Sequence, residues 1–197
     1  MNETLYSNIA DALVQDGYFI LRDSLSERLN LSLLAIAREE NGYKKAGISN
    51  ASSFRVDSSK RGDKTKWLDE DDGAQSEYLE FANGLKNHLN RSLYLGLKYY
   101  ESHFAIYDEG DFYEKHLDDF KSGKNRVVTT VYYLNENWVD GDGGELIIYD
   151  ENDEPLERVK PLSNTMVVFL SDKFAHEVLK ANKKRHSIAG WFRVDKI

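Results

Sequence analysis

Hydrophobic residues near the N-terminus recur at helical spacing. Leu5, Ile9 and Leu13 lie four residues apart, which predicts an amphipathic helix. An Asp-Gly pair at residues 16–17 interrupts this pattern and is expected to end the helix. The short apolar run at residues 18–21 then predicts a strand.

Two further helices are expected before residue 96. Ser24 is a candidate N-cap for the second helix, since Glu27 follows it by three residues in capping-box register. One apolar face of that helix would be formed by Leu25, Leu29, Leu33 and Ile36. Residues 41–73 are rich in Gly, Ser, Asn, Asp and Lys, which predicts a long, mostly irregular connection. The third helix is expected over about 74–95.

The pattern changes at Lys98, where short aromatic and β-branched runs begin to alternate with turn residues. Strands are predicted near 98–107, 113–116, 126–134, 144–149, 155–161, 164–170, 174–180 and 187–194. Many short strands at close spacing are typical of a sandwich or barrel. Because the helices come first, the sequence predicts an α+β fold with the helices packed on one sheet. A chain of 197 residues suits one such domain.

Composition narrows the classes of partner. The formal net charge is −8 and the sequence pI is about 5.2, so the protein is not expected to bind nucleic acid or anionic lipid. The chain has no cysteine, and any metal must therefore be held by nitrogen and oxygen ligands. We find neither a signal peptide nor a membrane-spanning apolar run, which predicts a cytoplasmic protein. Nothing in the sequence indicates the oligomeric state.

The segment around His116 contains candidate metal ligands. Residues two apart on a strand point to the same face, so His116 and Asp118 could bind one ion. His176 lies in a second apolar segment and is the best third ligand. Two histidines and one carboxylate form the facial triad of non-haem Fe(II) oxygenases, although zinc is chemically allowed as well. The other histidines are interpreted as surface or packed residues: His88, His103 and His186.

A basic segment follows His176. If the chain is extended there, Arg185, Ser187, Ala189 and Trp191 share one face. An inward guanidinium could bind a carboxylate through two hydrogen bonds, and Ser187 could add a hydroxyl donor. The alternative is that Arg185 belongs to a basic surface turn, and for this residue alone that alternative is favoured.

The chain resembles the 2-oxoglutarate/Fe(II) prolyl hydroxylases over about residues 16–194. The resemblance is strongest to the branch that includes the hypoxia-inducible-factor prolyl hydroxylases and their bacterial relatives. It is carried by residues 107–118 (YDEGDFYEKHLD), 126–135 (RVVTTVYYLN) with Trp138, 143–146 (GGEL), 176–178 (HEV) with Arg185 and residues 191–192, and 61–64 (RGDK) with Trp67. The RGDK loop separates this branch from the wider collagen-type relatives.

The resemblance implies a double-stranded β-helix, or jelly roll, over about 97–197, with a helical brace over about 1–96. It implies Fe(II) at His116, Asp118 and His176, chelated by the 1-carboxylate and 2-oxo group of 2-oxoglutarate. Arg185 would hold the distal carboxylate, with a hydrogen bond from Tyr133 and with Tyr107 beside the co-substrate. The alternative for both tyrosines is ordinary packing in the β core.

One position departs from the family pattern. Close relatives have a threonine four residues after the co-substrate arginine, where this chain has Ala189. A hydroxyl donor is lost there, and Ser187 could replace it. The departure bears on the geometry and affinity of co-substrate binding rather than on whether it occurs.

The implied reaction consumes O₂ and 2-oxoglutarate, releases succinate and CO₂, and hydroxylates a prolyl residue of an intracellular protein. Ascorbate is a candidate reductant. Expected substrate residues are Arg61, Asp63, Trp67, Arg126 and Trp191. For Asp63 and Arg126 a structural ion pair that pins the loop is an equal alternative.

Other functions remain open at this level. The same chemistry could act on a free amino acid or another side chain. A non-catalytic jelly-roll binding module would show no turnover of 2-oxoglutarate. A zinc hydrolase is a remote reading, because the sequence singles out no general base for it.

Overall fold

The computed structural model describes residues 2–50, 53–55, 59–118 and 125–194. The three expected helices are present as α1 (Asn2–Gln15), α2 (Glu27–Arg38) and α3 (Gly73–Leu93). The first helix ends where predicted, and Gly17 follows it in the left-handed region, with a φ of 86°. At the start of α3, the Asp72 side chain caps the helix by accepting hydrogen bonds from the backbone amides of Ala74 and Gln75.

The predicted cap of the second helix is wrong by two residues. Ser26, not Ser24, precedes α2 and accepts a hydrogen bond from the amide of Leu29 at 3.3 Å. The Ser24 hydroxyl instead lies 3.3 Å from the carbonyl oxygen of Asn164 in a distant loop. Two nearby serines offer the same capping chemistry, and the loop contact decides between them.

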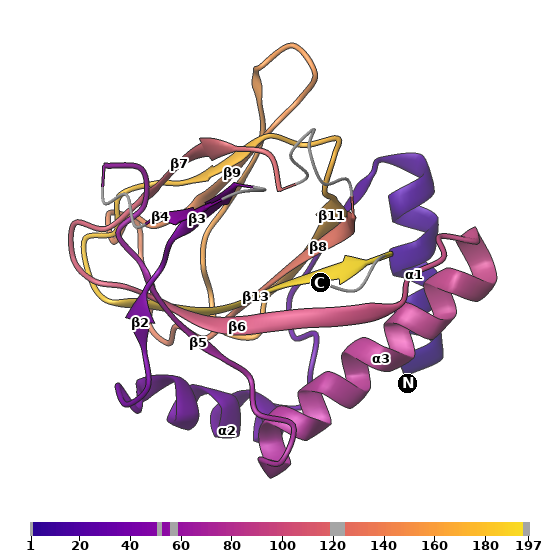
Figure 1. Cartoon of the computed structure of the whole chain (residues 1–197), viewed down its shortest axis with the longest axis horizontal. Coiled ribbons are helices and arrows are strands. Elements are labelled where there is room, and N and C mark those ends of the chain that lie inside the picture. Colours follow the sequence, from indigo (N-terminus) through magenta and orange to yellow (C-terminus); the bar gives the residue numbers. More distant parts are fainter. Residues whose placement is uncertain (1, 51–52, 56–58, 119–124, 195–197) are drawn as a thin grey trace.

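Two antiparallel sheets form the rest of the fold (Figure 1). The larger sheet has the strand order β1 (Tyr18–Leu21), β11 (Met166–Leu170), β8 (Arg126–Tyr133), β13 (Arg185–Arg193), β6 (Tyr99–Tyr107), β5 (Lys64–Trp67) and β2 (Lys44–Lys45). The smaller sheet has the order β10 (Pro155–Val159), β9 (Leu146–Tyr149), β12 (His176–Val178) and β7 (Tyr113–His116). All eight strands predicted after residue 97 are present. A separate hairpin is formed by β3 (Ile48–Asn50) and β4 (Ser53–Arg55).

The connection over 41–73, predicted to be mostly irregular, contains four short strands that the sequence did not predict. This segment supplies β2 and β5, which extend the larger sheet beyond β6, and also the β3–β4 hairpin. These strands are two to four residues long, and β5 reads Lys-Thr-Lys-Trp. Their hydrophobic pattern is weak, so they are held mainly by pairing with neighbouring strands, β5 with β6, β2 with β5 and β3 with β4, rather than by a pattern visible in the sequence.

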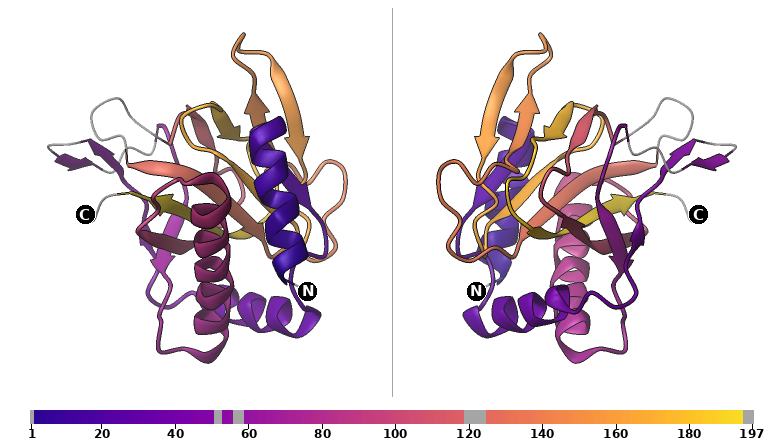
Figure 2. Two further views of the ribbon diagram at one scale, coloured as in Figure 1. Left: turned by 90° about the vertical axis from the view of Figure 1, so that its right-hand side faces the viewer. Right: turned by 90° about the vertical axis from the view of Figure 1, so that its left-hand side faces the viewer.

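The larger sheet separates two hydrophobic cores. One core lies between the sheet and the three helices, and the other lies between the two sheets. Figure 2 shows the helices on one side of the sheet and the smaller sheet on the other. Neighbours on β8 illustrate the alternation, since Tyr132 belongs to the helix-side core and Tyr133 to the inter-sheet core. The candidate site lies on the inter-sheet side. Among the described helices, none is long and apolar enough to cross a membrane.

Candidate metal and co-substrate site

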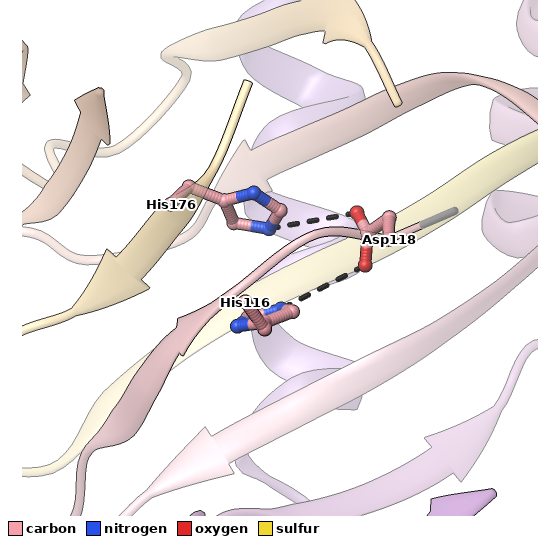
Figure 3. Close-up of side chains that lie close together, drawn as sticks. All are labelled: His116, Asp118 and His176. Carbon is pink, nitrogen blue, oxygen red and sulfur yellow. Dashed lines mark ion pairs between the residues drawn. The ribbon is translucent and has the colours of Figure 1, made fainter. Parts of the chain in front are cut away.

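Two histidines and one aspartate converge between the sheets (Figure 3). His116 at the end of β7 and His176 at the start of β12 are directly opposite each other in the antiparallel pairing. His116 Nε2 lies 3.7 Å from Asp118 Oδ1, and His176 Nε2 lies 3.5 Å from Asp118 Oδ2. One ligand atom from each residue falls within 4.8 Å of the others. The arrangement is compact enough for three side chains to hold one ion.

Backbone contacts orient both imidazoles. His116 Nδ1 donates to the carbonyl oxygen of Glu114 at 2.7 Å, and His176 Nδ1 donates to that of Phe174 at 3.1 Å. Each Nε2 is therefore the unprotonated nitrogen, and each faces Asp118. Burial, together with the nearby His176, lowers the pKa of His116 to about 3. A neutral imidazole is the form that binds a metal.

Asp118 is buried and stays ionised. Burial alone would raise its pKa, but the surrounding imidazoles and the Arg126 guanidinium hold the pKa at about 2. Thr129 donates a hydrogen bond to Asp118 Oδ2 at 2.8 Å, and Ser171 lies 2.9 Å from the Thr129 hydroxyl. A carboxylate and two neutral imidazoles form an N₂O donor set that suits a divalent transition metal.

The side chain of Arg185 is buried deeper between the sheets. Only 1% of this residue is exposed, so the alternative of a basic surface turn is wrong. Its Nε donates to the carbonyl oxygen of Gly144 at 2.8 Å, and its Nη1 donates to the Ser187 hydroxyl at 3.1 Å. No carboxylate of the described residues forms an ion pair with this guanidinium. A buried cation without a counter-charge is costly unless a ligand supplies one.

Two tyrosine rings flank this guanidinium. Its central carbon lies 4.8 Å from the ring centroid of Tyr107 and 5.0 Å from that of Tyr133. The Tyr133 hydroxyl is buried, and among the described residues its one polar neighbour is the Arg185 guanidinium. Burial raises the pKa of Tyr133 to about 12, so the hydroxyl stays protonated and can donate. A hydroxyl donor and a guanidinium together form a receptor for a carboxylate.

The RGDK loop contacts the metal segment through a tyrosine. Arg61 makes two hydrogen bonds with Asp63, of 2.7 Å and 2.6 Å, and both side chains are largely buried. The Arg61 guanidinium also lies 4.2 Å from the ring centroid of Tyr113, which stacks on His116 at 3.7 Å. The loop is thereby packed against a candidate metal ligand.

The other expected substrate residues lie on the larger sheet. Arg126 lies 3.9 Å over the ring of Trp191 and is 3.2 Å from Glu101, while Trp67 is 61% exposed. Asp63 and Arg126 are thus each in an ion pair, but not with each other. Trp67 and Trp191 both lie against the His103 ring, and the contact of all five expected residues with a substrate stays a prediction.

Comparison with known proteins agrees with this geometry. A family model for the 2OG-Fe(II) oxygenase superfamily matches residues 102–193. The fold is similar to the crystal structure of a Pseudomonas putida prolyl-4-hydroxylase, with a TM-score of 0.88 and 34% identity over 97% of this chain and 100% of that chain. The chain belongs to the 2OG-Fe(II) oxygenase superfamily. Its fold is accordingly of the jelly-roll type.

Other relatives of this oxygenase-family chain are also prolyl hydroxylases. One is a Trichoplax adhaerens prolyl hydroxylase in complex with a hypoxia-inducible-factor peptide fragment, with a TM-score of 0.84 and 25% identity over 98% of this chain and 90% of that one. Mouse prolyl hydroxylase EGLN3 is 32% identical over 67% of this chain. The chain spans 58% of the length of EGLN3 and 12% of that of a Caenorhabditis elegans hypoxia-inducible-factor prolyl hydroxylase.

The position of the Arg185 side chain in the oxygenase site requires a glycine at residue 144. This residue has a φ of 66°, and a Cβ added there would lie 2.9 Å from Arg185 Cδ. Gly144→Ala is expected to displace the guanidinium, raise the Michaelis constant for 2-oxoglutarate by about tenfold, and cost about 1–3 kcal/mol of stability. Gly141→Ala is the matched control, because Gly141 has a φ of 96° but open space around its Cβ position. Kinetics and urea unfolding of both variants test this, and equal Michaelis constants would contradict it.

Two buried histidines outside the triad predict that the free energy of unfolding decreases in acid. Burial lowers the pKa of His103 and of His186 to about 4 in the folded protein, from an unfolded value near 6.5. Unfolding then takes up protons, so stability is complete above pH 6.5 and falls as the pH drops toward 4. Each histidine contributes up to about 1.4 kcal/mol per pH unit. Urea unfolding between pH 7 and 4.5 measures this effect. The free energy of unfolding should decrease less steeply with falling pH for His103→Phe and for His186→Phe than for the unmodified protein.

Sequence reasoning missed several residues of this site. Thr129 and Ser171 orient Asp118, and no motif marks either hydroxyl as a ligand support. Glu101 accepts hydrogen bonds from Arg126 and Arg193 and is likewise unmarked. The alternation of side chains along each strand could have assigned these residues to the inner face of the larger sheet. It could not have shown which residues are neighbours, because the strand register comes only from the folded sheet.

Proposed function

We propose that this protein is an Fe(II)- and 2-oxoglutarate-dependent dioxygenase that hydroxylates a prolyl residue in a protein or peptide. The observation that carries the proposal is the placement of a buried, unpaired guanidinium at Arg185 in the same inter-sheet core as the triad. A triad alone would fit several metals and reactions. A metal site combined with a buried receptor for a carboxylate favours a chelating, dianionic keto acid.

The donor set fits the proposed metal. His116, Asp118 and His176 would hold Fe(II) through two imidazole nitrogens and a carboxylate, and their surroundings favour the neutral form of His116 and the ionised form of Asp118. Three protein ligands leave positions for a co-substrate and O₂. When bound, Fe(II) and 2-oxoglutarate would supply the O₂ activation that places a hydroxyl on a carbon, with succinate and CO₂ as co-products.

The residues of the chain would bind, orient and exclude water. Arg185 would pair with the distal carboxylate of 2-oxoglutarate, and the buried Tyr133 hydroxyl would donate a hydrogen bond to it. Tyr107 would cover the chain of the keto acid from β6. Ser187 already accepts a hydrogen bond from Arg185, which fixes the direction of the guanidinium. This contact supports the expectation that Ser187 replaces the hydroxyl that is lost at Ala189. The inter-sheet core around these groups would keep water from the reacting centre.

A prolyl substrate is supported by the relatives. The Trichoplax adhaerens relative is in complex with a hypoxia-inducible-factor peptide fragment. In this chain the substrate would contact the five expected residues, which are Arg61, Asp63, Trp67, Arg126 and Trp191. We further infer that residues 1–197 act as one oxygenase domain, with the helices bracing a double-stranded β-helix, and a cytoplasmic location stays a prediction.

The proposal is tested by the origin of the added oxygen. A lysate of the source organism is incubated with the purified protein, Fe(II), 2-oxoglutarate and ascorbate under ¹⁸O₂, and its peptides are analysed by mass spectrometry. We expect ¹⁸O-labelled hydroxyproline at a defined site, together with succinate, and no label with the His116→Ala variant. Label confined to free amino acids or other side chains would replace the prolyl assignment. Absence of both label and succinate would favour a non-catalytic module.

A further inference from the structure

The turn between α1 and β1 lies against the loop that precedes His176. Gly17 in this turn has a φ of 86°, and a Cβ added there would lie 2.9 Å from Phe174 Cε2 and 3.0 Å from Lys173 Nζ. The Lys173 ammonium group also donates a hydrogen bond to the carbonyl oxygen of Asp16 at 3.2 Å. Residues near the N-terminus therefore contact the residues that lead into β12, and the contact at Gly17 leaves no room for a side chain.

Strand β1 supports the same region through aromatic contacts. The Tyr18 ring stands edge-on to the ring of Phe174, with 5.7 Å between the centroids and an interplanar angle of 82°. In the pairing of β1 with β11, Tyr18 is directly opposite Phe169. The Phe169 ring in turn stands edge-on to the His176 imidazole at 4.8 Å. Edge-to-face packing is a favoured arrangement of aromatic rings, so β1 supports both phenylalanines that contact this histidine.

The Phe174 carbonyl connects this packing with metal binding. It accepts the hydrogen bond from His176 Nδ1 at 3.1 Å, which directs Nε2 toward Asp118 (Figure 3). The corresponding acceptor for His116 is the carbonyl of Glu114, a residue of β7 itself. Phe174 instead lies in the loop before β12. The orientation of His176 therefore depends on how this loop is packed, whereas that of His116 is set within one strand.

We propose that Gly17 and Tyr18 position the third metal ligand. The glycine lets the α1–β1 turn approach Phe174, the tyrosine ring holds the phenylalanine ring in place, and the phenylalanine carbonyl holds the His176 imidazole. Both residues lie outside the segment 102–193 that the family model matches. The inference rests on the proposed function for the role of His176 as a ligand, and it gives the N-terminal helix and strand a part in metal binding beyond covering the sheet.

A methyl group at residue 17 tests the close contact. Gly17→Ala is expected to displace the Phe174 ring and to reduce Co(II) affinity by about 10–100-fold, the usual effect of losing a group that orients a ligand. Gly42→Ala is the matched control, because Gly42 has the same φ of 86° and the nearest neighbour of an added Cβ, Lys66 Cδ, is 3.7 Å away. The control carries the same backbone strain but should bind Co(II) as the unmodified protein does. Competition with a chelator measures the affinity without O₂.

The Tyr18 side chain provides a second test that does not depend on backbone strain. Tyr18→Phe keeps the ring and removes only the hydrogen bond from the hydroxyl to Glu157, at 2.9 Å, so its Co(II) affinity should be unchanged. Tyr18→Ala removes the ring and should weaken Co(II) binding by at least about tenfold. If Gly17→Ala fails to fold, this pair of variants decides.

Nuclear magnetic resonance distinguishes positioning from a general loss of structure. In ¹³C,¹⁵N-labelled protein saturated with Zn(II), the Nδ1–H groups of His176 and His116 each report their own hydrogen bond. For Tyr18→Ala we expect the His176 Nδ1–H to exchange with water about tenfold faster than in the unmodified protein, because its hydrogen bond is weakened. The His116 Nδ1–H should exchange at its original rate, since its acceptor Glu114 belongs to β7.

The outcomes separate this inference from the proposed function, because metal affinity is measured without turnover. Equal Co(II) affinities of Gly17→Ala and Gly42→Ala would overturn the inference, and so would equal affinities of Tyr18→Ala and Tyr18→Phe or equally faster exchange at both histidines. If the expected pattern is found but Fe(II) and O₂ add no oxygen to any prolyl peptide, the positioning role stands and the proposed function fails. If oxygen is added but neither pair of variants differs in Co(II) affinity, the proposed function stands and this inference fails.

Discussion

His116→Ala is expected to abolish both metal binding and 2-oxoglutarate turnover. The variant leaves His176 and Asp118 as a two-ligand site and removes the imidazole that stacks on Tyr113. Loss of a group that only supports a ligand typically costs about 10–100-fold in metal affinity or activity. Loss of a ligand itself should exceed about 100-fold. Anaerobic titration with Fe(II) and assay of succinate formation measure the two effects independently.

Two controls make this prediction specific. His88→Ala removes a histidine from the helix side of the sheet and should leave metal affinity unchanged. Thr129→Ala removes the hydrogen bond to Asp118 and should reduce metal affinity by about 10–100-fold, an effect between those of His88→Ala and His116→Ala. Fe-dependent turnover by His116→Ala at the unmodified rate would place the metal elsewhere and remove the basis of the assignment.

The triad shows what strand periodicity can predict. His116 and Asp118 are two residues apart, so the spacing alone indicates one face of an extended chain. The third ligand requires information that spacing does not contain. His176 faces His116 because β12 lies between β9 and β7 in the smaller sheet, and that order arises from long-range pairing. The resemblance to a known family supplied what local pattern could not.

Burial was the least predictable property of the polar residues. Arg185 and His103 both lie in or beside segments that read as ordinary surface or core, yet one is a buried cation and the other a buried neutral ring. Their depth depends on which strands lie on either side, since β13 is flanked by β6 and β8. The short β2 and β5 strands were missed for the same reason, because neighbouring strands rather than their own side chains specify them.

Arg185→Met is expected to weaken co-substrate binding greatly while leaving the fold intact. The guanidinium makes two hydrogen bonds within the described protein, to Gly144 and Ser187, and has no carboxylate partner there. Removing one partner of a buried, charge-assisted pair costs about 2–5 kcal/mol, so the Michaelis constant for 2-oxoglutarate should rise at least about 30-fold. Arg185→Lys keeps the charge but loses the bidentate hydrogen bonding. Its Michaelis constant for 2-oxoglutarate should lie between those of Arg185→Met and the unmodified protein.

The same variant should be no less stable than the unmodified protein when 2-oxoglutarate is absent. An apolar side chain of similar length at position 185 removes a buried charge that has no counter-charge, a change that is often neutral or stabilising by about 1–4 kcal/mol. Adding 2-oxoglutarate at 100 times its dissociation constant should stabilise the unmodified, metal-loaded protein by about 2.7 kcal/mol, and at that concentration should barely affect Arg185→Met. Urea unfolding with and without the keto acid measures both effects. An unchanged Michaelis constant, together with full stabilisation by 2-oxoglutarate, would mean that another cation holds the distal carboxylate.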